Sequence, residues 1–198
     1  SYSVNGRYFA QRGYVYIIQD VRGRWSSEGD FEFLRNEADD GLVTMQWIAS
    51  QPWCGDKIGT LGISYTTATQ QALAVRNPPR LATQLLFDGP YNYHSQTMRH
   101  GGASEYAIAF QYVVSMARTG KQANADPRVR RQLDEMFASL TNWLIHLPLR
   151  QGASPLRLAP DYEQWFFDML TRPDYEDWWK TPDLAIEEFI DDYPDIPL

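Results

Sequence analysis

The sequence predicts an α/β fold in which a short parallel sheet comes first and an all-helical region follows. Two observations lead to this prediction. In the first half, apolar β-branched runs alternate with stretches of helical periodicity, which is typical of parallel strands joined by right-handed crossovers. After about Tyr93 the chain shows helical patterns and no convincing strand. We therefore expect two units, residues 1–92 and residues 93–198.

The first unit is predicted to begin with a helix and a strand. Residues 5–12 have helical character, and Gly13 is the expected stop signal. Residues 14–20 are apolar, β-branched and aromatic, the pattern of a strand buried on both faces. Residues 36–50 form the next predicted helix, because acidic residues suit its positive N-terminal end and apolar residues supply one face. The apolar residues are Leu42, Val43, Met45, Trp47 and Ile48.

Two more strands and a helix complete the predicted sheet. Residues 57–63 read as a second buried strand, and residues 65–76 as the helix that follows, which stops before Pro78. Residues 82–87 read as a third strand that ends at Asp88. This order predicts a parallel arrangement with helices between the strands.

The second unit is predicted to contain five helices. The first covers residues 103–118 and stops at Gly120. The second begins at Asp126, where an N-cap aspartate is followed by a first-turn proline, and runs to about His146. Shorter helices are expected over residues 161–170, 174–180 and 183–192.

Composition excludes several classes of protein. The chain has 198 residues, and its hydrophobic content of 43% suits an ordinary globular protein. No apolar run approaches the ~20 residues of a membrane span, so no membrane partner is expected. The net charge of -7 argues against a nucleic-acid surface, which needs a basic footprint. Cys54 is the only cysteine, which excludes an internal disulfide and is compatible with the cytoplasm.

The strongest chemical signal lies where the second strand meets its helix. Gly62, Ser64 and Tyr65 stand at the end of an apolar run, directly before a helical stretch. This is the layout of a nucleophile elbow, in which a serine occupies a sharp strand-to-helix turn. The turn crowds the backbone, so small residues are needed two positions either side of the serine. Gly62 meets that need, whereas Thr66 stands where the usual pattern has a second glycine.

Short motifs recur in order along nearly the whole chain, at residues 19–23, 27–31, 47–54, 62–65, 99–103 and 175–179. This ordered series is far more specific than the serine motif alone. It resembles the CocE/NonD hydrolases, a group that includes cocaine esterases, α-amino acid ester hydrolases and X-Pro dipeptidyl-peptidases.

The resemblance implies a partial α/β-hydrolase sheet followed by a helical cap, with Ser64 as the acyl-forming nucleophile. It makes the Tyr65 backbone N–H one donor of the oxyanion hole. The family pattern has a glycine three residues after the serine, where this chain has Thr67. A β-branched residue there is expected to add bulk near the helix start and to tolerate a positive φ badly.

The same resemblance implies that parts of the active site and sheet are outside these residues. A carboxylate and a histidine would follow on later strands, in the order serine, acid, histidine. The related esterases take a second oxyanion donor from an upstream tyrosine, and one family strand would insert between the first and second strands predicted here. We therefore expect these residues to be the middle of a longer hydrolase, and expect the isolated chain to show no esterase turnover above background.

Other candidates for the triad are weaker. His94 and His100 lie just past the third strand, but neither follows a strand-ending acid, and His146 sits in a predicted amphipathic helix. Asp88 ends a strand, as the acid does in some hydrolases, yet an Asp-Gly-Pro turn explains it better.

The substrate and its binding residues remain open at this level. Trp165, Phe166 and Trp178 could line an acyl pocket over Ser64, although an aromatic stripe at helical spacing is more often core. The substrate would be a small-molecule ester or amide, or a short X-Pro peptide, and no metal or organic cofactor is implied. The alternative function is a catalytically inactive hydrolase-like domain with a binding or structural role. A homo-oligomer or a completing segment would cover open sheet edges.

Overall fold

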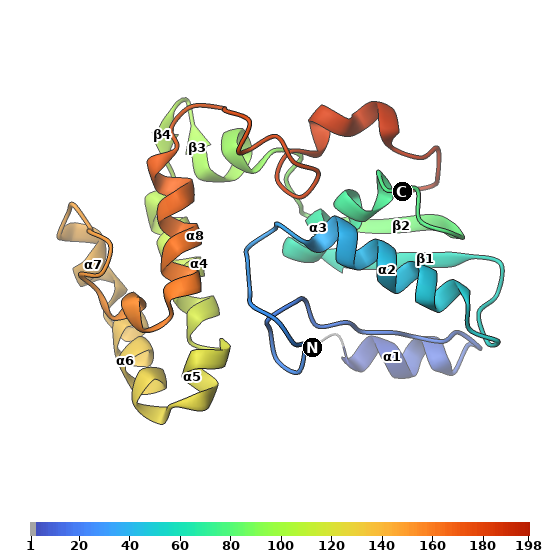
Figure 1. The fold of residues 1–198 in the computed structure, drawn as a ribbon, viewed down its shortest axis with the longest axis horizontal. Helices are drawn as coiled ribbons and strands as arrows, with labels where there is room; N and C mark the ends of the chain where they lie inside the picture. Colours follow the sequence, from blue (N-terminus) through green and yellow to red (C-terminus); the bar gives the residue numbers. More distant parts are fainter. Residues whose placement is uncertain (1–2) are drawn as a thin grey trace.

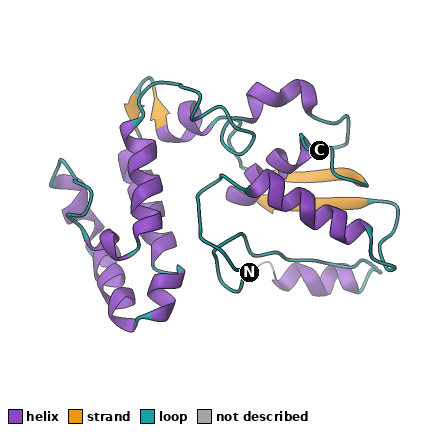
Figure 2. Cartoon of the chain, viewed as in Figure 1, coloured by secondary structure: helices purple, strands orange, loops and turns teal. Residues whose placement is uncertain are grey.

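The computed structural model describes residues 3–198, and its sheet is small. β1 (Ile58–Ile63) and β2 (Leu81–Phe87) pair in parallel, and α3 (Tyr65–Ala74) connects them. α3 also packs against both strands, so the three elements form one β-α-β crossover. α2 (Glu37–Ala49) lies beside α3, as Figures 1 and 2 show. These four elements confirm the predicted parallel α/β arrangement.

The predicted strand over residues 14–20 is wrong. This segment follows α1 (Ser3–Ala10) and runs extended without ladder pairing, so it is no strand in the described part of the chain. Most of its side chains are also exposed, with Tyr14 at 65% and Ile18 at 56%. A strand needs a neighbour for its backbone groups, and no described segment supplies one here. Residues 14–20 have the apolar pattern of a strand, but the described residues provide neither an adjacent strand nor a covering layer.

The sheet is also less buried than the sequence predicts. Gly62 is the only buried residue of β1, and Gln84 the only one of β2. Ile63 and Phe87 are about half exposed at 49% and 51%. Beyond β2, the C-terminal segment reaches the sheet, because Gln84 N donates to Pro197 O at 3.1 Å. The outer edge of β1 has no strand partner within residues 3–198.

α2 buries a narrower face than predicted. Met45 and Ile48 are buried, and they pack in a small core with Leu73 of α3. Gly41 allows the two helices to approach, since a Cβ there would stand 3.2 Å from a methyl of Leu73. Trp47, assigned to the apolar face, is 55% exposed, and Val43 is exposed as well. The exposed pair lies on the side of α2 that no described element covers.

The start of the helical unit contains a feature that the sequence does not predict. A π-helical turn, η1 (His94–Met98), leads into an antiparallel pair of two-residue strands, β3 (Arg99–His100) and β4 (Ala103–Ser104). Positive φ values at Gly101 and Gly102 close this hairpin. The expected absence of strands after Tyr93 is therefore wrong, and the helix expected from residue 103 begins later, at Tyr106.

The remaining helices follow the predicted order, with two additional short helices over residues 121–125 and 155–158. Asp126 does cap its helix, accepting a hydrogen bond from Arg128 N at 2.8 Å, but that helix breaks at Ser139 into two. Residues 174–180 form turns instead of a helix. The elements are α4 (Tyr106–Ala117), α5 (Lys121–Ala125), α6 (Pro127–Ala138), α7 (Leu140–Ile145), η2 (Pro155–Leu158), α8 (Pro160–Thr171) and η3 (Ile186–Asp192).

The largest core crosses the boundary drawn between the two units. Phe31 and Phe33, from the loop before α2, pack in one cluster with residues of α4 and α8. Arg24 of the same loop is 7% exposed and donates to Met116 O at 2.8 Å and to the Tyr162 hydroxyl at 2.7 Å. The division at residue 92 stays a prediction, and the two units share much of their interior. No helix in the described residues is both long and apolar enough to cross a membrane.

Candidate active site

Ser64 occupies the turn between β1 and α3 in a strained conformation. Its φ of 58° and ψ of -118° lie where residues other than glycine are rarely found. The turn is tied to the neighbouring strand, because Ser64 N donates to Phe87 O at 2.9 Å. Thr67 N donates to Ser64 O at 2.8 Å and starts the helix. Ser64 is exposed, so the strained turn presents its hydroxyl to solvent.

Gly62 is required by the close return of the chain onto itself. A Cβ at this position would stand 2.7 Å from Thr66 Cβ and 2.9 Å from Thr66 O. The predicted need for a small residue two positions before the serine is confirmed. On the other side, Thr66 stands in place of the usual glycine, and its Oγ1 accepts from Ile63 N at 2.8 Å.

The sequence predicts that Thr67 disturbs the elbow, but in the structure Thr67 fits into it. It lies in the first turn of α3 and is absent from the residues with positive φ. Its hydroxyl lies 2.6 Å from Phe87 O, so it adds a tie between α3 and the end of β2. Its methyl group faces Gly89, where a Cβ would stand 2.5 Å from Thr67 Cβ. Gly89, after β2, therefore leaves space for the Thr67 side chain. The family pattern avoids the need for this space by having a glycine within the helix, at the position of Thr67.

Tyr65 presents a free backbone donor beside the serine. As the first residue of α3, its N–H cannot bond within the helix, and no acceptor for it is found among residues 3–198. The Tyr65 hydroxyl donates to Glu37 Oε1 at 2.5 Å, and its ring meets Phe33 edge-on at 5.3 Å. A fixed N–H at a helix start next to an exposed serine is the geometry of an oxyanion donor.

Burial shifts the pKa of both partners in this contact. Burial raises the pKa of Glu37 to about 7, and the hydrogen bond from Tyr65 opposes part of that rise. Burial, together with the nearby Glu37 carboxylate, raises the pKa of Tyr65 well above its usual value. Asp183 lies close enough to Glu37 to add to its rise. In the sequence, Glu37 is recognisable only as one of the acidic residues that suit the N-terminal end of this helix. Its partner Tyr65 lies 28 residues further along the chain, so no local pattern indicates the contact.

None of the three histidines is hydrogen-bonded to Ser64. His94 Nε2 lies 2.9 Å from Pro173 O, and His100 Nδ1 lies 2.9 Å from Glu105 Oε1. His146 is exposed and contacts the backbone of its own helix. Asp88 is exposed with a positive φ of 45°, and its side chain makes no hydrogen bond within the described residues. The described residues therefore bring together the predicted nucleophile and the predicted oxyanion donor without a histidine hydrogen-bonded to Ser64.

The three aromatic candidates lie in different surroundings. Trp165 is 7% exposed and stacks on Phe33 at 4.4 Å, and Phe33 in turn contacts Tyr65. Phe166 is fully buried and packs against Phe110. Of the three, only Trp165 is linked to the elbow, because the Phe33 ring contacts both Trp165 and Tyr65.

Trp178 lies apart from this group. Arg35 stands over its ring at 3.7 Å and Arg172 at 5.0 Å. Arg35 also donates to the Trp178 carbonyl at 3.1 Å. These contacts tie the loop before α2 to the segment after α8, which is a structural arrangement.

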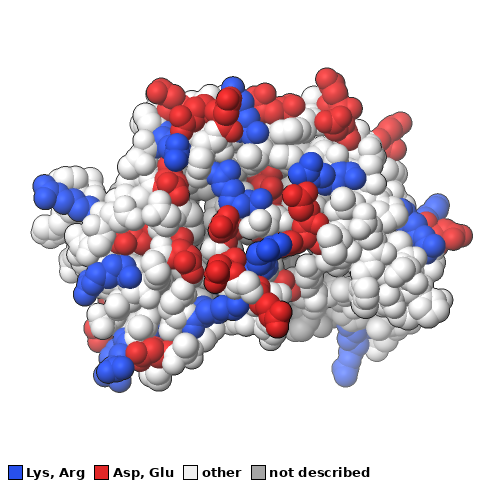
Figure 3. All heavy atoms as spheres, viewed as in Figure 1, with Lys and Arg blue, Asp and Glu red and all other residues white. Residues whose placement is uncertain are grey.

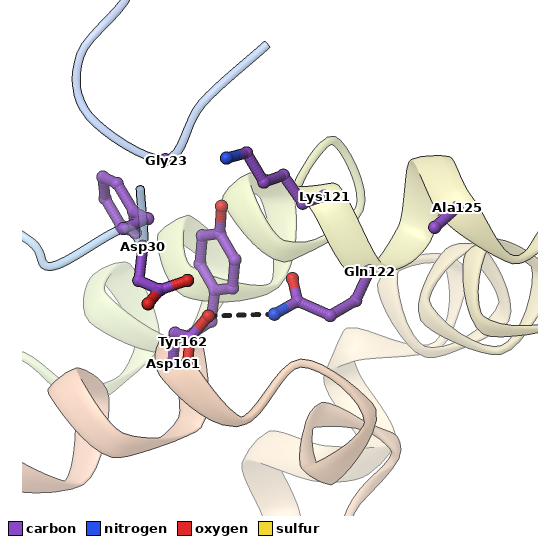
Figure 4. Close-up of a pocket in the computed structure, with 8 residues that line it drawn as sticks. Gly23, Asp30, Lys121, Gln122, Ala125, Asp161 and Tyr162 are labelled. Carbon is purple, nitrogen blue, oxygen red and sulfur yellow. Dashed lines mark hydrogen bonds between the residues drawn. The ribbon is translucent and has the colours of Figure 1, made fainter. Parts of the chain in front are cut away.

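A pocket of about 270 Å³ opens between the loop before α2 and the helical unit (Figure 4). Asp30 of the loop faces Asp161 and Tyr162 at the start of α8, and Lys121 comes from α5. Gln122 donates to Asp161 across one wall at 2.9 Å. None of the residues that line the pocket belongs to the elbow, so it does not serve Ser64.

Comparison with known proteins places the chain among hydrolases. The family model for X-Pro dipeptidyl-peptidase (S15 family) matches residues 1–191. Cocaine esterase of Rhodococcus sp. (strain MB1 Bresler) is 34% identical over 96 residues, which are 45% of this chain and 17% of that protein. A Mycobacterium bovis protein named as a serine esterase is 36% identical over 75 residues, 37% of this chain and 12% of its own length.

A solved structure shares the fold. The aminopeptidase from a marine sediment Thaumarchaeota archaeon superimposes with a TM-score of 0.58 at 18% identity, covering 90% of this chain and 30% of that one. Less than a third of this aminopeptidase, and less than a fifth of the cocaine esterase, corresponds to the chain.

Proposed function

Because the chain belongs to the X-Pro dipeptidyl-peptidase family S15, a family of hydrolases, we propose that Ser64 is the nucleophile of a serine hydrolase. The observation that carries this proposal is the strained Ser64 turn with its exposed hydroxyl. Ser64 Oγ attacks the carbonyl carbon of an ester or amide, and the leaving alcohol or amine departs with a proton. Water then hydrolyses the acyl-serine and releases the acid. The Tyr65 N–H stabilises the oxyanion in both steps.

The substrate class follows from the relatives rather than from the site. A small ester, an amide or a short X-Pro peptide suits a family that is described as a peptidase and includes a cocaine esterase. Trp165 is the best placed of the proposed substrate-binding residues, because Phe33 connects it to Tyr65. Phe166 is fully buried and would contribute only through packing, and Trp178 lies apart from both.

A small substrate also suits the charge of the surface. On the face drawn in Figure 3, Lys and Arg alternate with Asp and Glu, and acidic side chains gather along the edge where the C-terminal segment lies. Such a face lacks the continuous basic footprint of a nucleic-acid partner. We also propose a cytoplasmic location, which accords with the single free cysteine, Cys54.

We further propose that another segment supplies the histidine, the acid and a missing strand. Two features of the described residues support this: β1 has an unpaired outer edge, and residues 14–20 form no strand and are mostly exposed. A strand between them would satisfy both backbones. A second copy of the chain is the other candidate for covering these edges.

The test compares the chain alone with the chain expressed together with its neighbouring gene sequence. Hydrolysis of p-nitrophenyl acetate and labelling by a fluorophosphonate probe are measured for both, with Ser64→Ala as the control. We expect activity only in the longer protein, and its loss in Ser64→Ala. Turnover by the chain alone, abolished by Ser64→Ala, would contradict the need for a completing segment.

One alternative has support in the structure, namely an inactive hydrolase-like domain with a binding role. All three histidines are engaged away from Ser64. An inactive longer protein that fails to bind the fluorophosphonate probe would favour this alternative.

A further inference from the structure

A buried carboxyl group lies directly behind the proposed oxyanion donor. Glu37, the first residue of α2, is 8% exposed, and its Oε1 accepts the hydrogen bond from the Tyr65 hydroxyl at 2.5 Å. Buried carboxyl groups are costly unless they are paired, so one at this place calls for an explanation. Glu37 has no Lys or Arg partner within hydrogen-bonding distance in the described residues.

The position of Glu37 is itself held from two sides. α2 and α3 pack side by side (Figure 1), closely enough that Gly41 contacts Leu73. From the C-terminal segment, Asp183 Oδ1 accepts the N–H of Ala38 at 3.0 Å and caps α2. Asn36, at the N-cap position, makes no such bond with its side chain. The carboxyl of Glu37 is therefore presented to Tyr65 from a rigid helix start.

The Tyr65 side chain has no freedom of its own. Its hydroxyl is fixed by Glu37 and its ring by Phe33. These two contacts restrict the Tyr65 side chain and, with it, the position of the Cα next to the Tyr65 N–H. That N–H lies next to the strained Ser64, whose unusual φ must be maintained by its surroundings.

We propose that Glu37 is a positioning residue, which holds the Tyr65 backbone N–H toward the oxyanion through the Tyr65 hydroxyl. This inference rests on the proposed function, because it assigns Glu37 a role in the Ser64 reaction. It adds a residue of α2, 27 positions before Ser64, to the site. Glu37 touches neither substrate nor reacting atoms, and it acts through Tyr65 alone.

The test uses two variants that separate the hydrogen bond from the packing. Glu37→Gln keeps an acceptor oxygen, while Glu37→Met has similar volume and only a weakly accepting sulfur. Glu135→Met, at an exposed position of α6, is the matched control. Circular dichroism and thermal melting establish that each variant is folded.

The first readout needs no activity. In ¹⁵N-labelled isolated chain, the amides of Thr67 and Ala68 report the elbow, because both donate to Ser64 O. We expect Glu37→Met to speed their hydrogen exchange by about five- to tenfold, the effect of one lost hydrogen bond, and to shift the Tyr65 amide signal. Glu37→Gln should restore both. Unchanged exchange in Glu37→Met, or an equal change in Glu37→Gln, would overturn the proposal.

The second readout uses the longer, active protein. We expect Glu37→Met to lower kcat about tenfold with KM little changed. This loss is a fraction of the loss caused by removing an oxyanion donor altogether. Glu37→Gln should recover most of the lost kcat. Equal kcat in all variants would overturn the positioning role. An inactive wild-type protein would instead count against the proposed function, while the exchange experiment would still decide the role of Glu37.

Discussion

The side chain of Thr67 occupies space that Gly89 leaves open. A Cβ at residue 89 would stand 2.5 Å from Thr67 Cβ, closer than real Cβ contacts come. Thr67 is 2% exposed and its hydroxyl meets Phe87 O, so it cannot move aside without losing that bond. The bulky residue in the elbow helix and the small residue after β2 are thus complementary.

This pair predicts a double-mutant result. Gly89→Ala should lower the free energy of unfolding by about 2 kcal/mol, because the new methyl overpacks a buried site. Thr67→Gly should remove most of that loss when the two are combined, despite the cost of glycine within a helix. Urea unfolding of the wild type, both single variants and the double variant measures the coupling. Additive effects would show that the two positions do not share this space.

Gly62 offers a simpler test of the elbow. Gly62→Ala should destabilise the chain by about 2–3 kcal/mol, since its Cβ would meet the Thr66 carbonyl oxygen and the β1–α3 turn would have to open. Gly55→Ala is the matched control, because a Cβ there meets nothing within 4 Å and its φ is not positive. Thermal melting of both variants checks the contrast. A Gly62→Ala variant as stable as Gly55→Ala would be inconsistent with the turn described.

The buried Glu37 predicts how stability depends on pH. Its pKa is raised from 4.5 to about 7 on folding, so the folded state binds more protons than the unfolded state between these values. The contribution of this pKa shift to the free energy of unfolding is therefore fully present below pH 4.5 and is lost as the pH rises through 7. The total amounts to at most about 3 kcal/mol.

Comparison with Glu37→Gln isolates this contribution. The groups facing Glu37 are Tyr65 of α3, Asp40 of α2, Arg22 of the preceding loop and Asp183 of the C-terminal segment. Asp183 also has a raised pKa, mainly through burial, so it too makes the free energy of unfolding decline as the pH rises. Urea unfolding between pH 4 and pH 8 should show a shallower decline in Glu37→Gln than in the wild type. Parallel curves for the two proteins would contradict the raised pKa.

Arg24 should be the most sensitive arginine of the chain. It joins the loop before α2 to α4 and α8 through Met116 O, Thr119 Oγ1 and the Tyr162 hydroxyl. Arg24→Met should cost about 3 kcal/mol, because it leaves these buried groups unpaired. Arg131→Met, an exposed position of α6, should change stability by less than about 0.5 kcal/mol. Similar chemical denaturation midpoints for the two variants would exclude this anchoring role.

Elements with strong local signals were predictable. The periodicity of α2 and α3, the N-cap at Asp126 and the strand-to-helix turn at Ser64 all depend on nearby residues, and the structure has each of them. The helix break at Ser139 and the short β3–β4 hairpin were missed, because their signals are weak and only a few residues long.

The sequence by itself determined the β-α-β order, the strand-to-helix turn at Ser64 and the family, because local periodicity and motif order follow the order of residues along the chain. Only the tertiary structure decided that residues 14–20 stay exposed, since pairing depends on whether a neighbouring strand is present. It also decided that Gly89 accommodates Thr67 and that Glu37 holds Tyr65. Those contacts join residues more than 20 positions apart, and their energies depend on burial and distance, which a linear pattern does not contain.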